Sequence, residues 1–323
     1  MMVLFGNLFY IVLFTSLIGS IFSIFLLLVK KVLHLALPLW LGICGRAFFL
    51  VPVALPFLHL IPPENPQWIH EYEIACRIWL MGAAAFGVYS LVRGFLARRA
   101  LRRYRPCHDA RIHKIFAGCV IASGLKKEPA LYFGTLCEPA CVTAVFHPAI
   151  ILREDIAGQL TDQELFIVLC HEVTHIRRGH LLFQALAGLT CILQWFNPFA
   201  WISKNDFAAQ GEMDCDQSAL SAMRGRVTGT EYATAMLRLM ELSAKGRKRR
   251  GHDIAALGFL LARERLHHIL HGAPEIKNTV GTAVMVLLLA FTLLFSMYVS
   301  RFYFYPYPGY TVSIELADPG MSA

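Results

Sequence analysis

Four long apolar segments restrict the folds open to this chain of 323 residues more than any other feature. A helix of roughly 20 apolar residues crosses a bilayer core about 30 Å thick. The segments that meet this requirement are residues 8–29, 35–57, 74–96 and 280–299. A hydrophobic fraction of 56% and a charged fraction of 16% also favour a membrane protein over an ordinary soluble one. The sequence therefore predicts an α-helical membrane protein with four transmembrane helices.

Charges beside these segments predict their orientation. The first segment is followed by Lys30 and Lys31, whereas a secretory signal peptide carries its positive charge before the apolar run. Residues 62–73 contain no Lys or Arg, and residues 98–105 are strongly basic. Because positively charged loops stay in the cytoplasm, we expect both termini outside the cytoplasm and residues 97–279 inside it.

The expected organisation is a membrane region (1–96), a cytoplasmic α+β domain (97–279), a fourth span and a short tail (300–323). Two extended stretches, near 129–134 and 143–152, precede several helices in the domain. Residues 181–196 are apolar but too few for a comfortable span. The sequence does not decide whether they form a core helix or one that enters the membrane. The net charge of +8 is concentrated beside apolar runs, which favours contact with anionic lipid over direct nucleic-acid binding.

The chemically informative motif is His171-Glu172-Val173-Thr174-His175. Two histidines four residues apart project from one face of a helix and reach a single metal ion. Glu172 is placed to take a proton from the attacking water. Thr161-Asp162 before the motif is a helix-start signal, so the sequence predicts a capped helix that carries a zinc site.

A catalytic zinc ion needs a third protein ligand. Arg178 and Leu181 stand where the long metzincin motif requires Gly and His, so that class is excluded. Glu212 and Asp216 share a face of a later helical stretch, with Asp214 on another face. We expect Glu212 to bind the metal and Asp216 to accept the outer N–H of a ligand histidine.

Other parts of the site stay open. The group that stabilises the oxyanion could be His147, His180 or Tyr232, and the sequence does not rank them. The 143–152 stretch could pair with an extended substrate. It could equally be an internal strand of the domain.

Three stretches together resemble the BlaR/MecR-type antirepressor metallopeptidases. These are the metal helix 168–178, the preceding run 146–152, and residues 195–201 followed by 212–216. The resemblance implies a cytoplasmic gluzincin domain between spans three and four. It also implies His171, His175 and Glu212 as zinc ligands, Glu172 as the catalytic residue, and cleavage of a DNA-binding repressor, often with self-cleavage.

Two departures from that family pattern are visible. Only residues 301–323 follow Ser300, so we expect no C-terminal penicillin-binding sensor domain. His180 stands where many relatives carry an acidic residue. The activating signal, the scissile bond and the oligomeric state, including a homo-oligomer, stay open.

Alternatives remain at this point. One is a membrane quality-control metallopeptidase of the HtpX/Ste24 kind. Another is a non-catalytic signalling protein with a structural zinc site, against which an intact Glu172 argues. The basic loop 245–251 is either a solvated loop beside lipid headgroups or a self-processing site.

Overall fold

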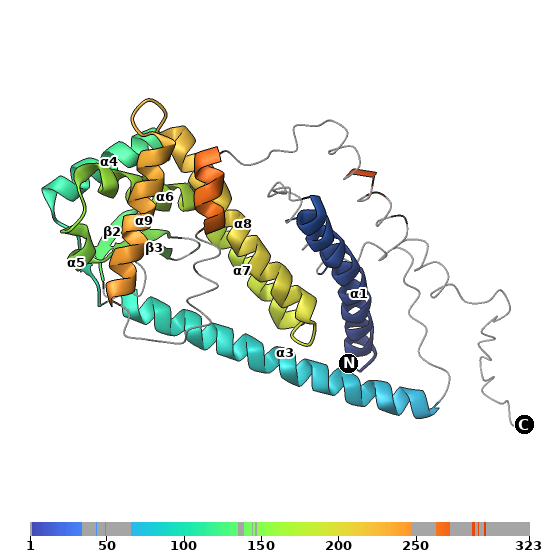
Figure 1. Cartoon of the computed structure of the whole chain (residues 1–323). Coiled ribbons are helices and arrows are strands. Elements are labelled where there is room, and N and C mark those ends of the chain that lie inside the picture. Colours follow the sequence, from blue (N-terminus) through green and yellow to red (C-terminus); the bar gives the residue numbers. More distant parts are fainter. Residues whose placement is uncertain are drawn as a thin grey trace, which may run out of the picture.

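Two long helices begin the chain in the computed structural model, and a mixed unit of helices and strands follows (Figure 1). The helices are α1 (Met2–Leu33) and α3 (Pro66–Leu101). The structure describes residues 2–33, 43, 49, 66–101, 103–134, 139–143, 145, 147–246, 263–271, 286, 287, 290 and 294.

Two helices of the described residues are long and apolar enough to cross a membrane. The candidate spans are Ile11–Val29 in α1 and Glu71–Ala100 in α3. They coincide with the predicted first and third spans, although α3 continues beyond residue 96 to Leu101. Apart from isolated positions, the predicted second and fourth spans and the tail 300–323 lie outside the described residues.

A small mixed sheet forms the base of the mixed unit of helices and strands that follows α3. Its strands are β1 (Arg105–Pro106), β2 (Ala130–Phe133), β3 (Ala140–Thr143) and β4 (Ala149–Leu152), in the order β1-β2-β4-β3. β2 and β4 run parallel, and the other two pairs are antiparallel. All four residues of β4 are buried, as expected for a strand inside a sheet.

The prediction of one extended stretch over 143–152 is wrong. β3 ends at Thr143, β4 begins at Ala149, and these two residues face each other across an antiparallel pair. Pro148 lies in the connection, where its missing N–H prevents a continuous strand ladder. The stretch predicted near 129–134 is confirmed as β2.

Helices α4 (Ala110–Ser123), α5 (Glu154–Ala157) and α6 (Asp162–Arg177) contribute to the core of this unit. α6 packs against α4 on one side and β3 on another. Phe116 of α4, Leu152 of β4 and Leu169 of α6 are fully buried in one hydrophobic cluster. The observed mixture of helices and strands agrees with the α+β class predicted for this part of the chain.

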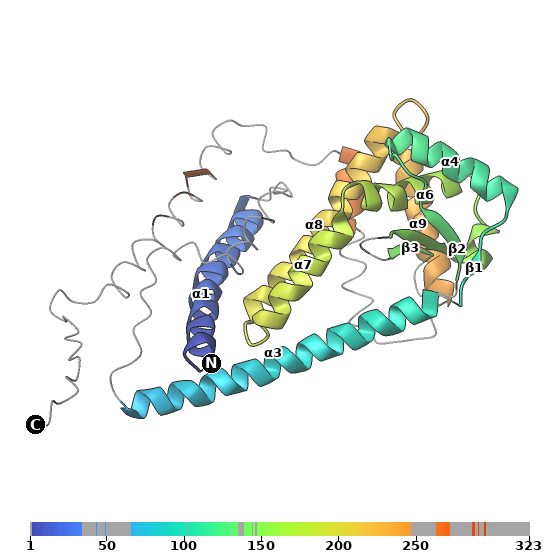
Figure 2. The same ribbon diagram turned by 180° about the vertical axis from the view of Figure 1, so that it is seen from behind.

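A helical hairpin connects the mixed unit to α1 and α3. It consists of α7 (His180–Leu193) and α8 (Pro198–Ala222), which lie side by side in both views (Figures 1 and 2). Asn197 caps α8 through its side chain, and Pro198 occupies the first turn, where a missing N–H costs nothing. α9 (Gly229–Gly246) then returns to pack on α6.

Candidate metal centre

The start of α6 sets the position of its two histidines. Thr161 Oγ1 accepts a hydrogen bond from the Glu164 N–H, and the Glu164 carboxylate accepts one from the Thr161 N–H. This reciprocal capping box confirms the predicted helix start. The helix then runs without interruption through His171 and His175, so both imidazoles project from the same face.

The structure brings His171, His175 and Glu212 together. The two Nε2 atoms lie 3.1 Å apart. Each lies 3.5 Å from one oxygen of the Glu212 carboxylate, which α8 contributes. The ligand atoms all lie within 4.8 Å of one another. Two imidazole nitrogens and one carboxylate oxygen are the donor set of many catalytic zinc sites, so the residues present fit a metal ion.

Glu172 lies beside this cluster, on the side of β3. Its carboxylate accepts a hydrogen bond from the Val142 backbone. Burial raises the pKa of Glu172 most, the charge of His171 opposes that shift, and the charge of Glu212 adds to it. The resulting pKa is about 7. A carboxyl group with a pKa near neutrality is suited to both accepting and returning a proton.

A buried ionic network surrounds the outer nitrogen of His171. His171 Nδ1 lies 3.1 Å from Asp216 Oδ1 and 3.0 Å from the Tyr232 hydroxyl. Tyr232 donates a hydrogen bond of 2.9 Å to the same Asp216 oxygen. Arg265, from the helical segment 263–271, donates to both Asp216 oxygens and lies 3.1 Å from Glu212 Oε2. This network is placed to fix the tautomer of His171.

The outer nitrogen of His175 has different neighbours. Gly179 adopts a left-handed conformation with φ of 67°, which turns the chain sharply between α6 and α7. The turn brings His180 back against His175, with the two Nδ1 atoms 3.3 Å apart. Cys215 Sγ also lies 3.2 Å from His180 Nδ1. His180 Nε2 has no hydrogen-bond partner among the described residues but lies 3.4 Å from Asp214 Oδ2.

These surroundings shift the pKa values of the two histidines in opposite directions. Burial opposes charge on His171, but its hydrogen bonds to Asp216 and Glu212 outweigh burial and raise its pKa to about 10. Burial and the charge of His171 lower the pKa of His175 to about 3. The charges on Asp216 and Arg265 stabilise each other, which lowers the pKa of Asp216 despite its burial.

The three residues considered for the oxyanion are not equivalent in the structure. Tyr232 and His180 contact the outer nitrogens of the histidines, so they lie behind the cluster. His147 is exposed between β3 and β4. Arg265 was missed by sequence reasoning, because no local motif marks a residue that reaches Asp216 across 49 positions.

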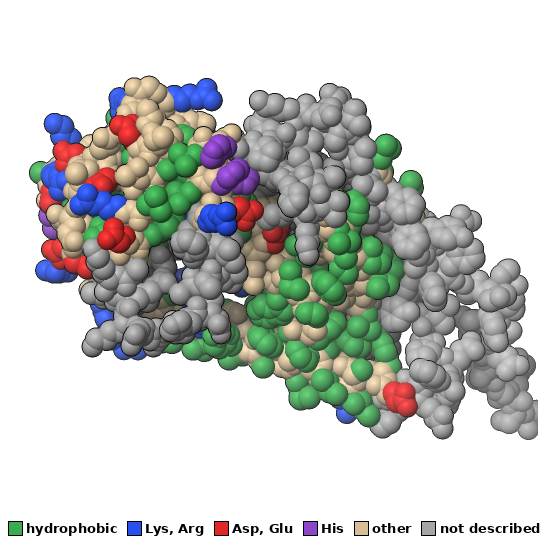
Figure 3. Space-filling view, in the orientation of Figure 1, with side chains coloured by type: hydrophobic (Ala, Val, Ile, Leu, Met, Phe, Trp, Pro, Cys, Tyr) green, Lys and Arg blue, Asp and Glu red, His purple; other side chains and the backbone are tan. Residues whose placement is uncertain are grey.

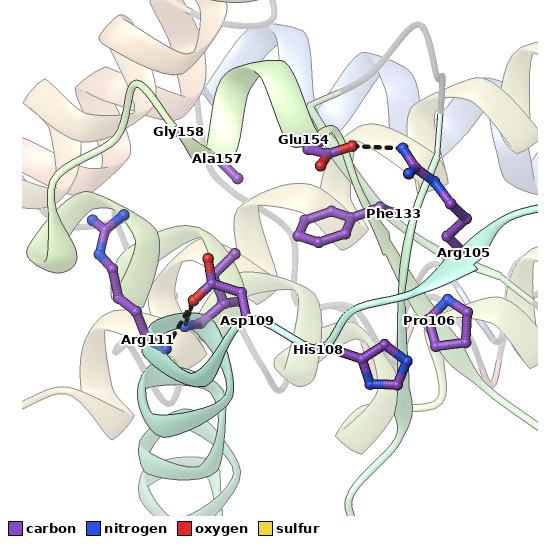
Figure 4. Close-up of a pocket in the computed structure, with 10 residues that line it drawn as sticks. Arg105, Pro106, His108, Asp109, Arg111, Phe133, Glu154, Ala157 and Gly158 are labelled. Atoms are coloured by element: carbon purple, nitrogen blue, oxygen red, sulfur yellow. Dashed lines mark hydrogen bonds and ion pairs between the residues drawn. The ribbon is translucent and has the colours of Figure 1, made fainter.

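A surface pocket lies elsewhere, where β1 meets the starts of α4 and α5 (Figure 4). Its lining includes Arg105 and Glu154, which form an ion pair of 3.0 Å. Asp109 in the same wall caps α4 by accepting hydrogen bonds from two backbone N–H groups. None of the histidine cluster lines this pocket, so it is separate from the candidate metal centre.

Comparisons with known proteins bear on this geometry. A family model described as BlaR1 peptidase M56 matches residues 59–266, which is more than half of the chain. The regulatory protein BlaR1 of Bacillus licheniformis is 23% identical over 173 residues, covering 50% of this chain and 29% of that protein. The methicillin resistance mecR1 protein of Staphylococcus aureus is 23% identical over 120 residues, covering 37% and 20% respectively. The matched part is thus less than a third of either relative.

Proposed function

The chain belongs to the BlaR1 peptidase M56 family, and on that premise we propose that it is a membrane-bound zinc endopeptidase that cuts a cytoplasmic protein. The substrate we propose is a DNA-binding transcriptional repressor, cut in the course of transmembrane signalling. The observation that carries the enzymatic part is the convergence of His171, His175 and Glu212 beside a half-buried Glu172. The relatives that match are regulatory and resistance proteins, which supports the signalling part.

In this proposal His171, His175 and Glu212 hold the zinc ion. A zinc ion bound there supplies a Lewis acid, which lowers the pKa of water toward about 7 and polarises a carbonyl group. Asp216 accepts the outer N–H of His171 and thereby directs its Nε2 toward the metal position. His180 plays the corresponding part for His175, since its Nδ1 faces the outer nitrogen of that ring.

Glu172 acts as the general base and acid. Its pKa of about 7 lets it take a proton from water and return it to the leaving amine. The strand within the 143–152 stretch is β4, which lies between β2 and β3 and has no open edge, whereas β3 is at the edge of the sheet. An extended peptide that adds to β3 would lie beside Glu172, which already contacts Val142 of that strand.

We propose that the lipid bilayer holds α1 and α3, with the peptidase unit in the cytoplasm and both termini outside it. Lys30 and Lys31 after the first span and the basic run 98–105 after the third support this orientation. The cut protein is the proposed partner, without direct contact between this chain and nucleic acid. A homo-oligomer stays an open alternative.

The test compares newly formed protein N-termini in cells that produce wild type, Glu172→Gln or Glu154→Gln. Glu154→Gln is the matched control, because Glu154 is exposed and its ion pair with Arg105 contributes little. We expect cleavage products in wild type and the control, and their loss by more than about 100-fold in Glu172→Gln. Zinc content of the purified proteins should be equal in all three.

The outcomes separate the alternatives. A repressor among the cut proteins supports the proposal, and damaged membrane proteins in its place support the HtpX/Ste24-like alternative. Bound zinc without any Glu172-dependent cut supports a non-catalytic signalling protein. Cuts in this chain itself within 245–251 would establish self-processing. Most of that loop lies outside the described residues.

A further inference from the structure

The α7–α8 hairpin has an apolar outer face that the rest of the described structure leaves open. Leu182, Leu186 and Leu189 recur along one side of α7 and are 47%, 43% and 45% exposed. Phe196 at the turn and Ile202 on α8 are also exposed. No residue from 181 to 203 carries a charge. In Figure 3 hydrophobic side chains cover this part of the molecule, whereas charged side chains gather over the peptidase unit.

The tip of the hairpin is joined to the N-terminal half of a candidate membrane span. The Gln194 amide donates to the Val12 carbonyl and to Thr15 Oγ1. The Asn197 amide donates to Ser16 Oγ and Ser20 Oγ. These α1 residues all lie within Ile11–Val29.

The depth of this contact follows from helix geometry. At about 1.5 Å per residue, the contacted part of α1 lies about 13–25 Å from Val29, the end of the span next to Lys30. A bilayer core is about 30 Å thick, so the contact reaches past its midplane if α1 crosses it. The hairpin tip must then lie at the same depth.

Backbone groups in the turn at the tip have hydrogen-bond partners within the protein, as a medium without water requires. Trp79 of α3 donates its indole N–H to the Leu193 carbonyl at 2.9 Å. Trp201 donates to the Trp195 carbonyl at 3.1 Å. Pro198 has no N–H to satisfy. Backbone groups inside a bilayer need protein partners of this kind. Within the described residues, the Gln194 side-chain oxygen Oε1 is buried without a hydrogen-bond partner.

Charge returns only near the base of the hairpin. Lys204 lies seven residues after Asn197, about 10 Å back along α8 at helical rise. Its ammonium group lies over the Trp201 ring, 5.6 Å from the centroid, and its long stem allows it to reach the interface. Gln210 donates to the Asp206 carboxylate at 2.7 Å. By the same helix geometry Lys204 lies about 3–15 Å inside the bilayer core, so its ammonium group must extend along its stem toward the interface.

From these observations we infer that residues 182–203 form a re-entrant hairpin immersed in the bilayer, with lipid acyl chains covering its outer face. The sequence left this point open for residues 181–196. The metal centre then lies at the base of the hairpin, close to the membrane surface. Asn197 caps the uninterrupted helix that carries Glu212, so α8 connects the contact with α1 to the candidate metal ligand.

The experiment measures the environment of spin labels on the full chain in phosphatidylcholine–phosphatidylglycerol liposomes. Labels are attached at Leu186→Cys on the hairpin, Leu91→Cys on α3 and Ile121→Cys on α4. All three parent side chains are exposed, with Ile121 at 79% and Leu91 at 74%. Unmodified protein is labelled in parallel, because the chain has nine cysteines of its own. Collisions with oxygen report acyl chains, and collisions with a polar nickel chelate report water.

We expect several-fold higher oxygen-to-nickel ratios at Leu186→Cys and Leu91→Cys than at Ile121→Cys. Labels at Leu182→Cys, Leu186→Cys and Leu189→Cys should give steadily increasing ratios, because depth increases toward the tip. A water-like Leu186→Cys beside a lipid-like Leu91→Cys overturns this inference and leaves the proposed membrane protein intact. Water-like ratios at both positions overturn the membrane assignment itself. Zinc content equal to wild type confirms that each labelled variant is folded.

Discussion

The two histidines of the candidate metal centre lie one helical turn apart, yet their surroundings differ in charge. His171 faces a carboxylate, a phenol and a guanidinium group, contributed by Asp216, Tyr232 and Arg265. His175 faces the imidazole of His180. Despite its burial, the pKa of His171 rises to about 10 through its contacts with Asp216 and Glu212, whereas burial and the charge of His171 lower the pKa of His175 to about 3. Two histidines on one helix face therefore differ in protonation because only one of them has a carboxylate at its outer nitrogen.

The difference indicates two kinds of support for one metal centre. The His171 side joins α8, α9 and the segment 263–271 through buried charges, so it should contribute to folding as well as to metal binding. The His175 side involves the turn at Gly179 and a partly exposed ion pair between Arg178 and Asp214. The His175 side should therefore affect the orientation of the His175 imidazole more than the free energy of unfolding.

Glu212→Ala should have the largest effect on zinc binding, because the Glu212 carboxylate contacts both histidines. It lies 3.5 Å from each histidine Nε2 and 3.1 Å from Arg265. Loss of a direct ligand should weaken zinc binding by more than about 100-fold, which exceeds the effect of losing a residue that only hydrogen-bonds a ligand. Competition with a fluorescent chelator measures this, with Glu154→Ala as control. A zinc affinity equal to wild type in Glu212→Ala would show that Glu212 is not a zinc ligand.

Asp216→Ala should have the second-largest effect, and it should affect both folding and metal binding. It removes the carboxylate that accepts two hydrogen bonds from Arg265 and leaves Glu212 as the remaining carboxylate beside that guanidinium, which costs up to about 3–5 kcal/mol of unfolding free energy. Zinc affinity should fall about 10–100-fold as well. Urea unfolding of the metal-free protein in micelles, followed by chelator competition, separates the two effects.

Asp214→Ala on the same helix is the control for that measurement. The Asp214 side chain is 19% exposed, compared with 2% for Asp216. We expect its loss of unfolding free energy to be clearly smaller. Equal losses in the two variants would contradict the distinction between the two sides of the centre.

Local signals explain what the sequence predicted well. The Thr161 cap and the spacing of His171 and His175 depend only on neighbouring residues, and the structure confirms the helix start. The i, i+4 relation of Glu212 and Asp216 likewise follows from helix periodicity. Pro148 was also a local signal, and its missing N–H should have divided the stretch 143–152 into two strands.

Long-range contacts explain what the sequence could not predict. Arg265 reaches Asp216 from another helix, and nothing in its own surroundings marks it as part of the centre. His180 was visible only as a departure from an expected acidic residue. Its contact with His175 depends on the left-handed turn at Gly179, which sequence reasoning did not place.

His180→Ala should weaken zinc binding by about 10-fold, near the lower end of the range for loss of a residue that hydrogen-bonds a metal-binding histidine. It removes the acceptor that faces His175 Nδ1. His180→Asn is the matched variant, because its amide oxygen offers an acceptor near the same position, and we expect affinity within a few-fold of wild type. Zinc release rates measured with excess chelator distinguish the two. Equal release from both variants would show that His180 only fills space.

Tyr232→Phe should have the smallest effect and gives the finest test of the His171 side. The variant loses a hydroxyl that bonds Asp216 and His171. The carboxylate keeps both Arg265 contacts, and His171 Nδ1 keeps Asp216 at 3.1 Å. We therefore expect about 1 kcal/mol lower unfolding free energy and less than about 10-fold weaker zinc binding. A loss as large as that of Asp216→Ala would mean that the Tyr232 hydroxyl, and not the Asp216 carboxylate, holds the ring of His171 in place.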